Sequence, residues 1–231
     1  MKWIPDATGR FLQRPFYSDE ELDIECEVFA ANLLRARHGA VQFPLSTDDL
    51  TVLIEREVDD LDLHAELRRE GNVIEGVTEF RTGCKPRVLI SKHLSKTDRY
   101  INRLRTTLAH EWGHVHFHAF LHSGSPSINL KLFGDEAKQS VNHPGCQTVE
   151  TMPAASDWME WQAWYAAGAI LMPISALRNI VQDLHDVGED EPEQLVACIS
   201  AQFQVSRDAA RVRLSRLGFL SRARSIHDLP E

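Results

Sequence analysis

One stretch of the chain, residues 98–122, constrains the fold more than any other. Its apolar residues Ile101, Leu104 and Leu108 recur at intervals of three and four, the spacing of one face of an α-helix. We therefore predict one long helix whose apolar face packs into the core. The same helix carries the motif HEWGH at residues 110–114.

The motif has the spacing of a zinc site. His110 and His114 lie four residues apart, so both imidazoles project from one helical face and can converge on one zinc ion. Glu111 can accept a proton from the water that such a metal activates. The same letters can arise by chance around a merely structural pair of histidines, but the helical context favours a metal site. We predict two zinc ligands, His110 and His114, and a general base, Glu111.

A rival pair of histidines lies on the same helix. His118 follows His114 by four residues, and His116 and His122 are close in sequence. The rival pair has no glutamate directly after its first histidine. We interpret these three histidines as residues that support the site, pack in the core or lie at the surface, with direct metal contact left open.

A catalytic zinc normally has three protein ligands and one open position. A histidine six residues after His114 would mark a metzincin, but Phe120 stands there and Phe117 replaces the expected glycine. Glu160 is a better candidate, because it lies in a strongly apolar predicted helix, 157–171, where a carboxylate needs a reason. The alternative is a surface glutamate on an amphipathic helix.

The segment between the two predicted helices, residues 123–156, shows no sustained period and contains Gly, Pro, Ser and Asn. Long segments of this kind often border functional sites, so we expect it to limit entry to the cleft. His143 or Cys146 could occupy the open metal position and keep the site latent. A simple loop role is favoured for both.

Helices and a small sheet alternate in the rest of the chain. Ser18 is a typical N-cap of one early helix, and a second helix is expected to begin near Ser46. Asp157 can cap the helix that follows it, and Ser175 is a candidate cap after Pro173. Two short helices are expected at 192–203 and 206–217. Strand-like alternation at 61–67 and 73–80 predicts a hairpin, followed by a third strand at 87–91. These patterns predict an α+β fold with a small antiparallel sheet.

Composition places the chain among folded proteins without a generally basic surface. It is 43% hydrophobic and 26% charged, with a net charge of -9, which disfavours nonspecific binding to nucleic acid. The first residues lack a secretory pattern, and no apolar run approaches the ~18–20 residues of a membrane span. Four scattered cysteines without a C-x-x-C pair are expected to be reduced. We expect a cytoplasmic protein with no membrane partner.

Two segments of the sequence resemble the ImmA/IrrE metallopeptidases. They are TLAHEWGH at 107–114 and EWQAWYAAGAILMP at 160–173, the second with Tyr165 as its aromatic residue and with Trp164 and Gly168 as additional features. A looser similarity covers about 61–220. The resemblance implies a zincin-like core and a zinc site of His110, His114 and Glu160, with Glu111 as general base. It also implies a substrate class, helix-turn-helix repressors of mobile elements or stress genes.

The domain organisation follows from these segments. We predict an N-terminal helical region at 1–60, a metallopeptidase core at 61–186 and a C-terminal, helix-turn-helix-like extension at 187–231, with an acidic linker near 188–192. The extension is rich in arginine, at positions Arg207, Arg211, Arg213, Arg216, Arg222 and Arg224. We favour a solvated face or a docking surface over a DNA-binding helix.

Two functions compete at this point. The first is a zinc endopeptidase that cleaves a specific protein partner. The second is a DNA-binding regulator or toxin-antitoxin component with a structural or vestigial zinc site. Glu111 favours the enzyme, because a structural site needs ligands but no general base.

Overall fold

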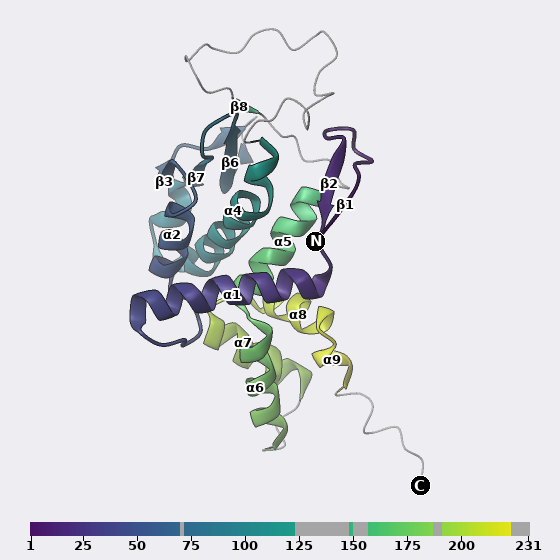
Figure 1. Cartoon of the computed structure of the whole chain (residues 1–231). Helices are drawn as coiled ribbons and strands as arrows, with labels where there is room; N and C mark the ends of the chain where they lie inside the picture. Colours follow the sequence, from purple (N-terminus) through teal and green to yellow (C-terminus); the bar gives the residue numbers. More distant parts are fainter. Residues whose placement is uncertain (70–71, 123–147, 150–156, 187–190, 223–231) are drawn as a thin grey trace.

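The computed structural model of the chain describes residues 1–69, 72–122, 148–149, 157–186 and 191–222 (Figure 1). Its strands are β1 (Lys2–Pro5), β2 (Gln13–Phe16), β3 (Asp60–Ala65), β4 (Arg68–Arg69), β5 (Asn72–Val73), β6 (Gly76–Arg81), β7 (Arg87–Ser91) and β8 (Thr148–Val149). Its helices are α1 (Asp19–His38), α2 (Thr47–Glu55), α3 (Lys92–Ser95), the 3-10 turn η1 (Asp98–Tyr100), α4 (Ile101–His122), α5 (Trp158–Leu171), α6 (Ile174–Asp186), α7 (Pro192–Phe203), α8 (Arg207–Arg216) and α9 (Phe219–Arg222). The predicted α+β class is confirmed, with helix predominating; the zincin-like core stays a prediction.

The helix starts follow their capping residues. Ser18 and Ser46 each accept a hydrogen bond from the backbone N–H three residues later, and the acid at that position bonds back to the cap. Asp157 caps α5 through the N–H of Met159. The predicted cap Ser175 is wrong: α6 begins one residue earlier, because the Pro173 carbonyl accepts its first helical bond.

The main sheet has the order β3-β7-β6-β8, with β3 parallel to β7 and the other neighbours antiparallel. The two longer strands near 61–67 and 73–80 therefore do not pair as a hairpin, although the short strands β4 and β5 between them pair antiparallel. The prediction of a purely antiparallel sheet is wrong. The third strand, β7, lies between β3 and β6. Its side chains Val88 and Ile90 are fully buried, so this strand forms a central position of the sheet and pairs on both sides.

One hydrophobic core joins most of the molecule. It includes residues of α1, α2, α4, α5, α7 and α8 and of the main sheet. In Figure 1, α1 runs across α4 and α5, with the sheet and α2 towards one end of α1 and the β1–β2 hairpin at the other. The predicted division at residues 60 and 186 stays a prediction, but the core itself crosses both positions.

A smaller apolar cluster lies at the start of α5. It contains Phe11, Phe80, Leu121, Trp158 and Met159, contributed by the N-terminal hairpin loop, β6, α4 and α5. The N-terminal region is therefore not only helical, because its β1–β2 hairpin covers the beginning of α5.

The structure bears on two predictions, the absence of a membrane-spanning helix and the reduced state of the cysteines. Within the described residues, no helix has the length and apolar character that crossing a membrane requires. Cys26 and Cys198 are free, but Cys84 is disulfide-bonded, so the expectation that all cysteines are reduced is wrong for Cys84. Spacing along a sequence does not reveal which sulfur atoms approach one another in space.

Candidate metal centre

The site is assembled where α4 and α5 touch at Gly113. A Cβ atom added to Gly113 would lie 2.9 Å from the Cα of Ala163 and 3.0 Å from its carbonyl oxygen. No side chain fits between the two backbones, so the helices approach as closely as glycine allows. This contact places the first turn of α5, with Glu160, beside the histidine pair of α4.

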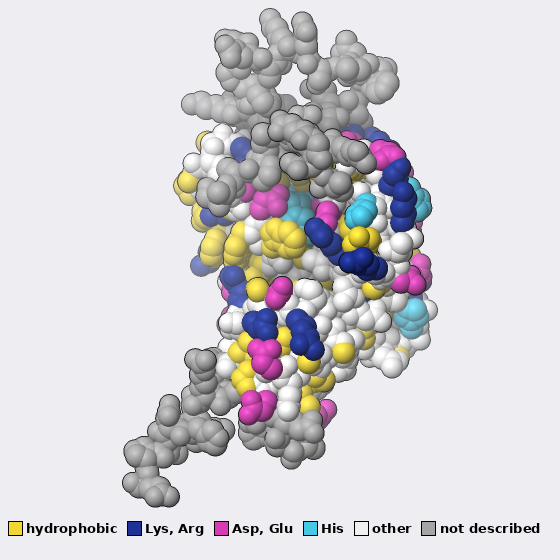
Figure 2. Space-filling model, turned by 180° about the vertical axis from the view of Figure 1, so that it is seen from behind, with side chains coloured by type: hydrophobic (Ala, Val, Ile, Leu, Met, Phe, Trp, Pro, Cys, Tyr) yellow, Lys and Arg dark blue, Asp and Glu magenta, His cyan; other side chains and the backbone are white. Residues whose placement is uncertain are grey.

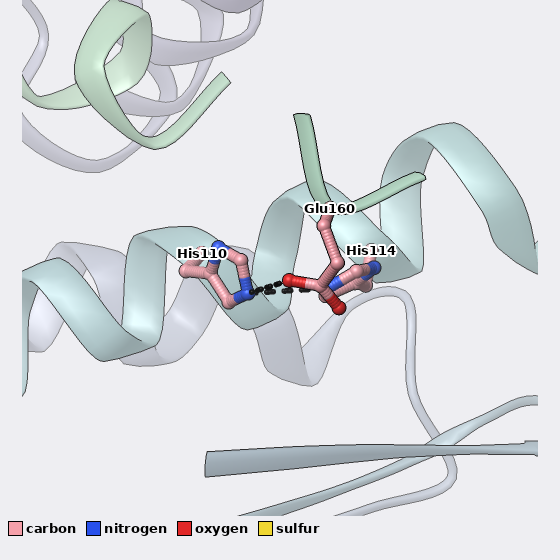
Figure 3. Close-up of side chains that lie close together, drawn as sticks. All are labelled: His110, His114 and Glu160. Atoms are coloured by element: carbon pink, nitrogen blue, oxygen red, sulfur yellow. Dashed lines mark hydrogen bonds and ion pairs between the residues drawn. The ribbon is translucent and has the colours of Figure 1, made fainter. Parts of the chain in front are cut away.

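The three predicted ligands lie together (Figure 3). The Nε2 atoms of His110 and His114 are 3.1 Å apart. One carboxylate oxygen of Glu160 lies 3.3 Å from Nε2 of His110, and the other lies 3.3 Å from Nε2 of His114. Two imidazole nitrogens and one carboxylate oxygen form a donor set suited to zinc. Both rings are buried, whereas the Glu160 side chain is 35% exposed, so the cluster reaches the surface on the α5 side.

The charges of the cluster favour an ionised carboxylate. The neighbouring imidazoles of His110 and His114 lower the pKa of Glu160 far below its usual value, although burial alone would raise it. A carboxylate that stays ionised can act as a metal ligand over a wide pH range. The donor chemistry of the three residues therefore fits a divalent metal ion.

Glu111 follows His110 on α4, and its carboxylate meets strand β6 close enough to His110 and Glu160 to interact with their charges. Its side chain is buried, and one oxygen accepts a hydrogen bond of 2.6 Å from the Thr78 hydroxyl. A Cβ on Gly76 would lie 2.4 Å from the other oxygen, so only glycine leaves room for the carboxylate. Burial raises the pKa of Glu111, while His110 and the Thr78 hydrogen bond oppose this effect. A higher pKa makes a carboxylate a better proton acceptor.

Sequence patterns did not single out Gly76 and Thr78 as site residues. They belong to a strand of the sheet that precedes the helical motif, and only the packing of β6 on α4 brings them to Glu111. The only signal in the sequence is a glycine at the start of a strand, which can mark a close approach of another group.

His118 is the histidine that touches a predicted ligand. Its Nδ1 lies 3.3 Å from Nδ1 of His114, and its Nε2 lies 3.0 Å from the side-chain oxygen of Gln162. The ring is fully buried, and this burial lowers the pKa of His118 well below its usual value. Among the described residues, the metal-binding group contains His110, His114 and Glu160 and not His118.

His116 and His122 face away from the cluster. His116 bonds to Glu57 at 2.9 Å and to Glu25 at 3.2 Å, and these carboxylates raise its pKa to about 9 against the opposing effect of burial. His122 stacks on Phe80 with ring centroids 4.2 Å apart, and burial lowers its pKa to about 4. Among the predicted roles, His122 therefore packs in the core, and His116 is partly buried between Glu25 and Glu57.

Trp164 covers the outer side of the cluster. Its ring lies 4.2 Å from that of His110, yet 56% of the residue is exposed. Figure 2 shows hydrophobic side chains directly beside histidine and acidic side chains on this face of the molecule. A large indole left open next to the donor atoms is a ready contact for an apolar group of a bound molecule.

Three of the four arginines of α8 pair with acidic side chains of the protein. The pairs are Arg211 with Glu193, Arg213 with Asp23 and Arg216 with Asp19. Arg213 is almost fully buried and cannot reach a nucleic acid. The helix-turn-helix-like character and the interpretation of this stretch as a docking face both stay predictions, and Arg224 lies outside the described residues.

His143, Cys146 and most of the segment 123–156 also lie outside the described residues. Their predicted roles, gating of the metal and restriction of the cleft, stay predictions.

A histidine pair on one helix, a glutamate on the next and a buried carboxylate beside them are the parts of a metallopeptidase site. The family model for the IrrE N-terminal-like domain, Peptidase_M78, matches residues 76–215. This match covers more than half of the 231 residues, so the chain belongs to this peptidase family, and the resemblance found in the sequence is confirmed. A search of curated proteins finds no match.

Proposed function

We propose that this protein is a zinc-dependent endopeptidase that cleaves a specific protein partner, a helix-turn-helix repressor of a mobile element or stress regulon. The observation that supports the peptidase is the buried Glu111, which follows His110 on α4 and interacts electrostatically with His110 and Glu160 of the cluster. The substrate class rests on the family resemblance. The chain's membership of a peptidase family supports the reaction type.

The residues have distinct tasks in this proposal. His110, His114 and Glu160 hold zinc, which supplies Lewis-acid activation of water and of the peptide carbonyl. Glu111 takes the proton from the attacking water and delivers it to the leaving amide nitrogen. Thr78 and Gly76 keep the Glu111 carboxylate in one place, because a hydroxyl donor and an absent side chain define its position.

The second candidate function, a DNA-binding regulator or toxin-antitoxin component, receives less support. A structural zinc site would not need a buried proton acceptor at Glu111. Of the α8 arginines, Arg213 is buried with Asp23, and Arg211 and Arg216 are already paired with surface carboxylates, which makes all three less available to bind phosphates. We therefore place direct DNA binding behind proteolysis.

The test compares the zinc-loaded wild type with Glu111→Gln. Each protein is incubated with a helix-turn-helix repressor identified by sequencing the genes next to its own and, separately, with casein. We expect one zinc per chain in both proteins, cleavage of the repressor by the wild type alone and little digestion of casein. Full cleavage by Glu111→Gln would overturn the mechanism, and rapid digestion of casein would overturn the specificity.

A further inference from the structure

A chain of hydrogen bonds leads from the β1–β2 hairpin to the cluster of His110, His114 and Glu160. It starts at the backbone carbonyl of Pro15 in β2, a group that can only accept. The side-chain nitrogen of Gln162 lies 3.1 Å from this oxygen, so the amide orientation is fixed. The Gln162 oxygen then faces Nε2 of His118 at 3.0 Å and must accept from an N–H there.

The same logic continues through the two rings. A neutral His118 that donates from Nε2 presents Nδ1 as an acceptor. This Nδ1 lies 3.3 Å from Nδ1 of His114, which must therefore carry the proton. Nε2 of His114 is then left with a free lone pair, and this atom faces His110 and Glu160. Only an unprotonated nitrogen can bind a metal ion.

Because the side chains in this chain of hydrogen bonds are buried, water cannot take the place of their partners. Gln162 is 1% exposed and His118 is fully buried, so neither side chain faces bulk water that could replace its partners. His110 differs: its Nδ1 is buried and has no hydrogen-bond partner among the described residues. His114 is thus the ligand whose proton position is determined by the rest of the protein.

The hairpin that supplies the carbonyl is attached firmly to α5. Arg10 in the hairpin loop makes two hydrogen bonds to Asp157, the cap of α5. Asp6 accepts a hydrogen bond of 3.1 Å from the indole N–H of Trp158. Both contacts lie within about two helical turns of Gln162, so they hold β2 at a constant distance from that side chain.

We propose that the β1–β2 hairpin is part of the metal centre, with Gln162 and His118 as positioning residues that set the ring orientation and the tautomer of His114. The hairpin lies outside the family match at 76–215, so this chain adds the support from its own N-terminal region. The inference rests on the proposed function only in taking His114 as a metal ligand.

The first test reads the tautomers directly. Histidine is labelled with nitrogen-15, and ring signals are recorded in zinc-free protein above neutral pH, because bound metal would itself force the His114 tautomer. We expect the proton on Nδ1 in His114 and on Nε2 in His118. The opposite tautomer of His118 in the wild type would overturn the proposal without any variant.

The second test uses Gln162→Met, which keeps the length and volume of the side chain but removes both hydrogen bonds. We expect mixed tautomers for His118 and about 10–100-fold weaker zinc binding in competition with a chelator, the usual loss for a supporting partner. Ile199→Val in α7 is the control, because Ile199 is fully buried and belongs to a helix outside the cluster. It should lower stability modestly and leave zinc affinity unchanged.

The outcomes separate this inference from the proposed function. Unchanged tautomers and zinc affinity in Gln162→Met would refute the positioning role even if the wild type is an active peptidase. A wild type that binds zinc, shows the expected tautomers and cleaves no repressor would refute the proposed substrate and leave the positioning role standing. Equal losses of zinc affinity in Gln162→Met and Ile199→Val would show that the weaker zinc binding comes from lower protein stability, and this would overturn the inference.

Discussion

Gly113 of α4 faces the backbone of Ala163 of α5 so closely that a Cβ on the glycine would lie 2.9 Å from the alanine Cα. The two helices carry all three members of the donor cluster, so the distance between them decides whether Glu160 reaches His110 and His114. The glycine inside the HEWGH motif thus has a role in packing that is separate from the chemistry of its neighbours.

We expect Gly113→Ala to force α5 away from α4. The unfolding free energy should fall by about 1–3 kcal/mol from overpacking, and zinc affinity should fall at least tenfold because Glu160 retreats. Urea denaturation and chelator competition measure the two effects. Gly168→Ala is the matched control, since its new Cβ would lie 3.6 Å from Cδ of Arg213, an ordinary contact. Full zinc affinity in Gly113→Ala would contradict this account of the helix contact.

Gly76→Ala should separate catalysis from metal binding. Its new Cβ would lie 2.4 Å from an oxygen of Glu111, so the carboxylate must move while the three donors keep their places. We expect normal zinc content and a loss of repressor cleavage of about 10²–10⁴-fold, the usual contribution of a general base. Val77→Ala is the control, because alternate residues of a strand face opposite sides. Equal activity of the two variants would show that Glu111 tolerates displacement.

Glu160→Gln should preserve the fold and weaken zinc binding. The amide is nearly the same shape as the carboxylate, but it carries no charge to offset that of the metal. We expect less than one zinc per chain by elemental analysis after dialysis against a weak chelator. The control is Glu193→Gln in α7, a change at an exposed glutamate that pairs with Arg211 of α8. This variant should keep full zinc occupancy. If Glu160→Gln also keeps it, the third ligand is wrongly assigned, and Asp157 and His143 become the candidates.

Trp164→Ala tests the exposed indole beside His110. If this ring contacts an apolar side chain of the substrate, its loss should raise KM about tenfold, corresponding to about 1.4 kcal/mol, with a smaller change in kcat. Trp161→Ala is the control on the same helix, because that ring lies under the guanidinium of Arg216. Equal effects of the two substitutions on KM would argue against a specific contact at Trp164.

Asp49 gives a prediction about stability and pH. Burial alone would raise its pKa, but hydrogen bonds from Ser46 and the nearby His38 lower it below the usual value. A lowered folded-state pKa stabilises the protein above the unfolded-state pKa of about 3.9, and this stabilisation is lost as pH falls through the folded-state value. Asp49→Asn should therefore cost about 1–3 kcal/mol near pH 7 and progressively less below about pH 4.

Urea denaturation of both proteins between pH 7 and pH 3 measures this difference. Asp48→Asn is the neighbouring control, since Asp48 is 74% exposed and its ion pair with Arg37 should contribute no more than about 1 kcal/mol. A difference between wild type and Asp49→Asn that stays constant across this pH range would contradict the prediction.

Local patterns were sufficient for the parts of the site that lie on single helices. The four-residue spacing of His110 and His114 and the caps Ser18 and Asp157 depend on neighbours in sequence, and the structure has them as predicted. Strand pairing failed because it depends on which strand is most apolar, and the buried β7 displaced the expected hairpin.

Contacts between distant segments left no trace in the sequence pattern. Pro15 and Gln162 are 147 residues apart, and a proline carbonyl has no side-chain signature that a motif could reveal. Thr78 reaches Glu111 across 33 residues for the same reason. The clustering of His110, His114 and Glu160 could be predicted from the sequence, whereas the groups that contact them could be identified only from the packing.

The ion pair between Asp23 of α1 and Arg213 of α8 constrains how the sequence can diverge. The two residues are 190 positions apart, bond at 2.6 Å and are both nearly inaccessible to water. A change at either position would leave the other charge unpaired in the interior, at a cost of about 3–5 kcal/mol. That is a large fraction of the stability of a typical domain, so substitutions at positions 23 and 213 have to be inherited together.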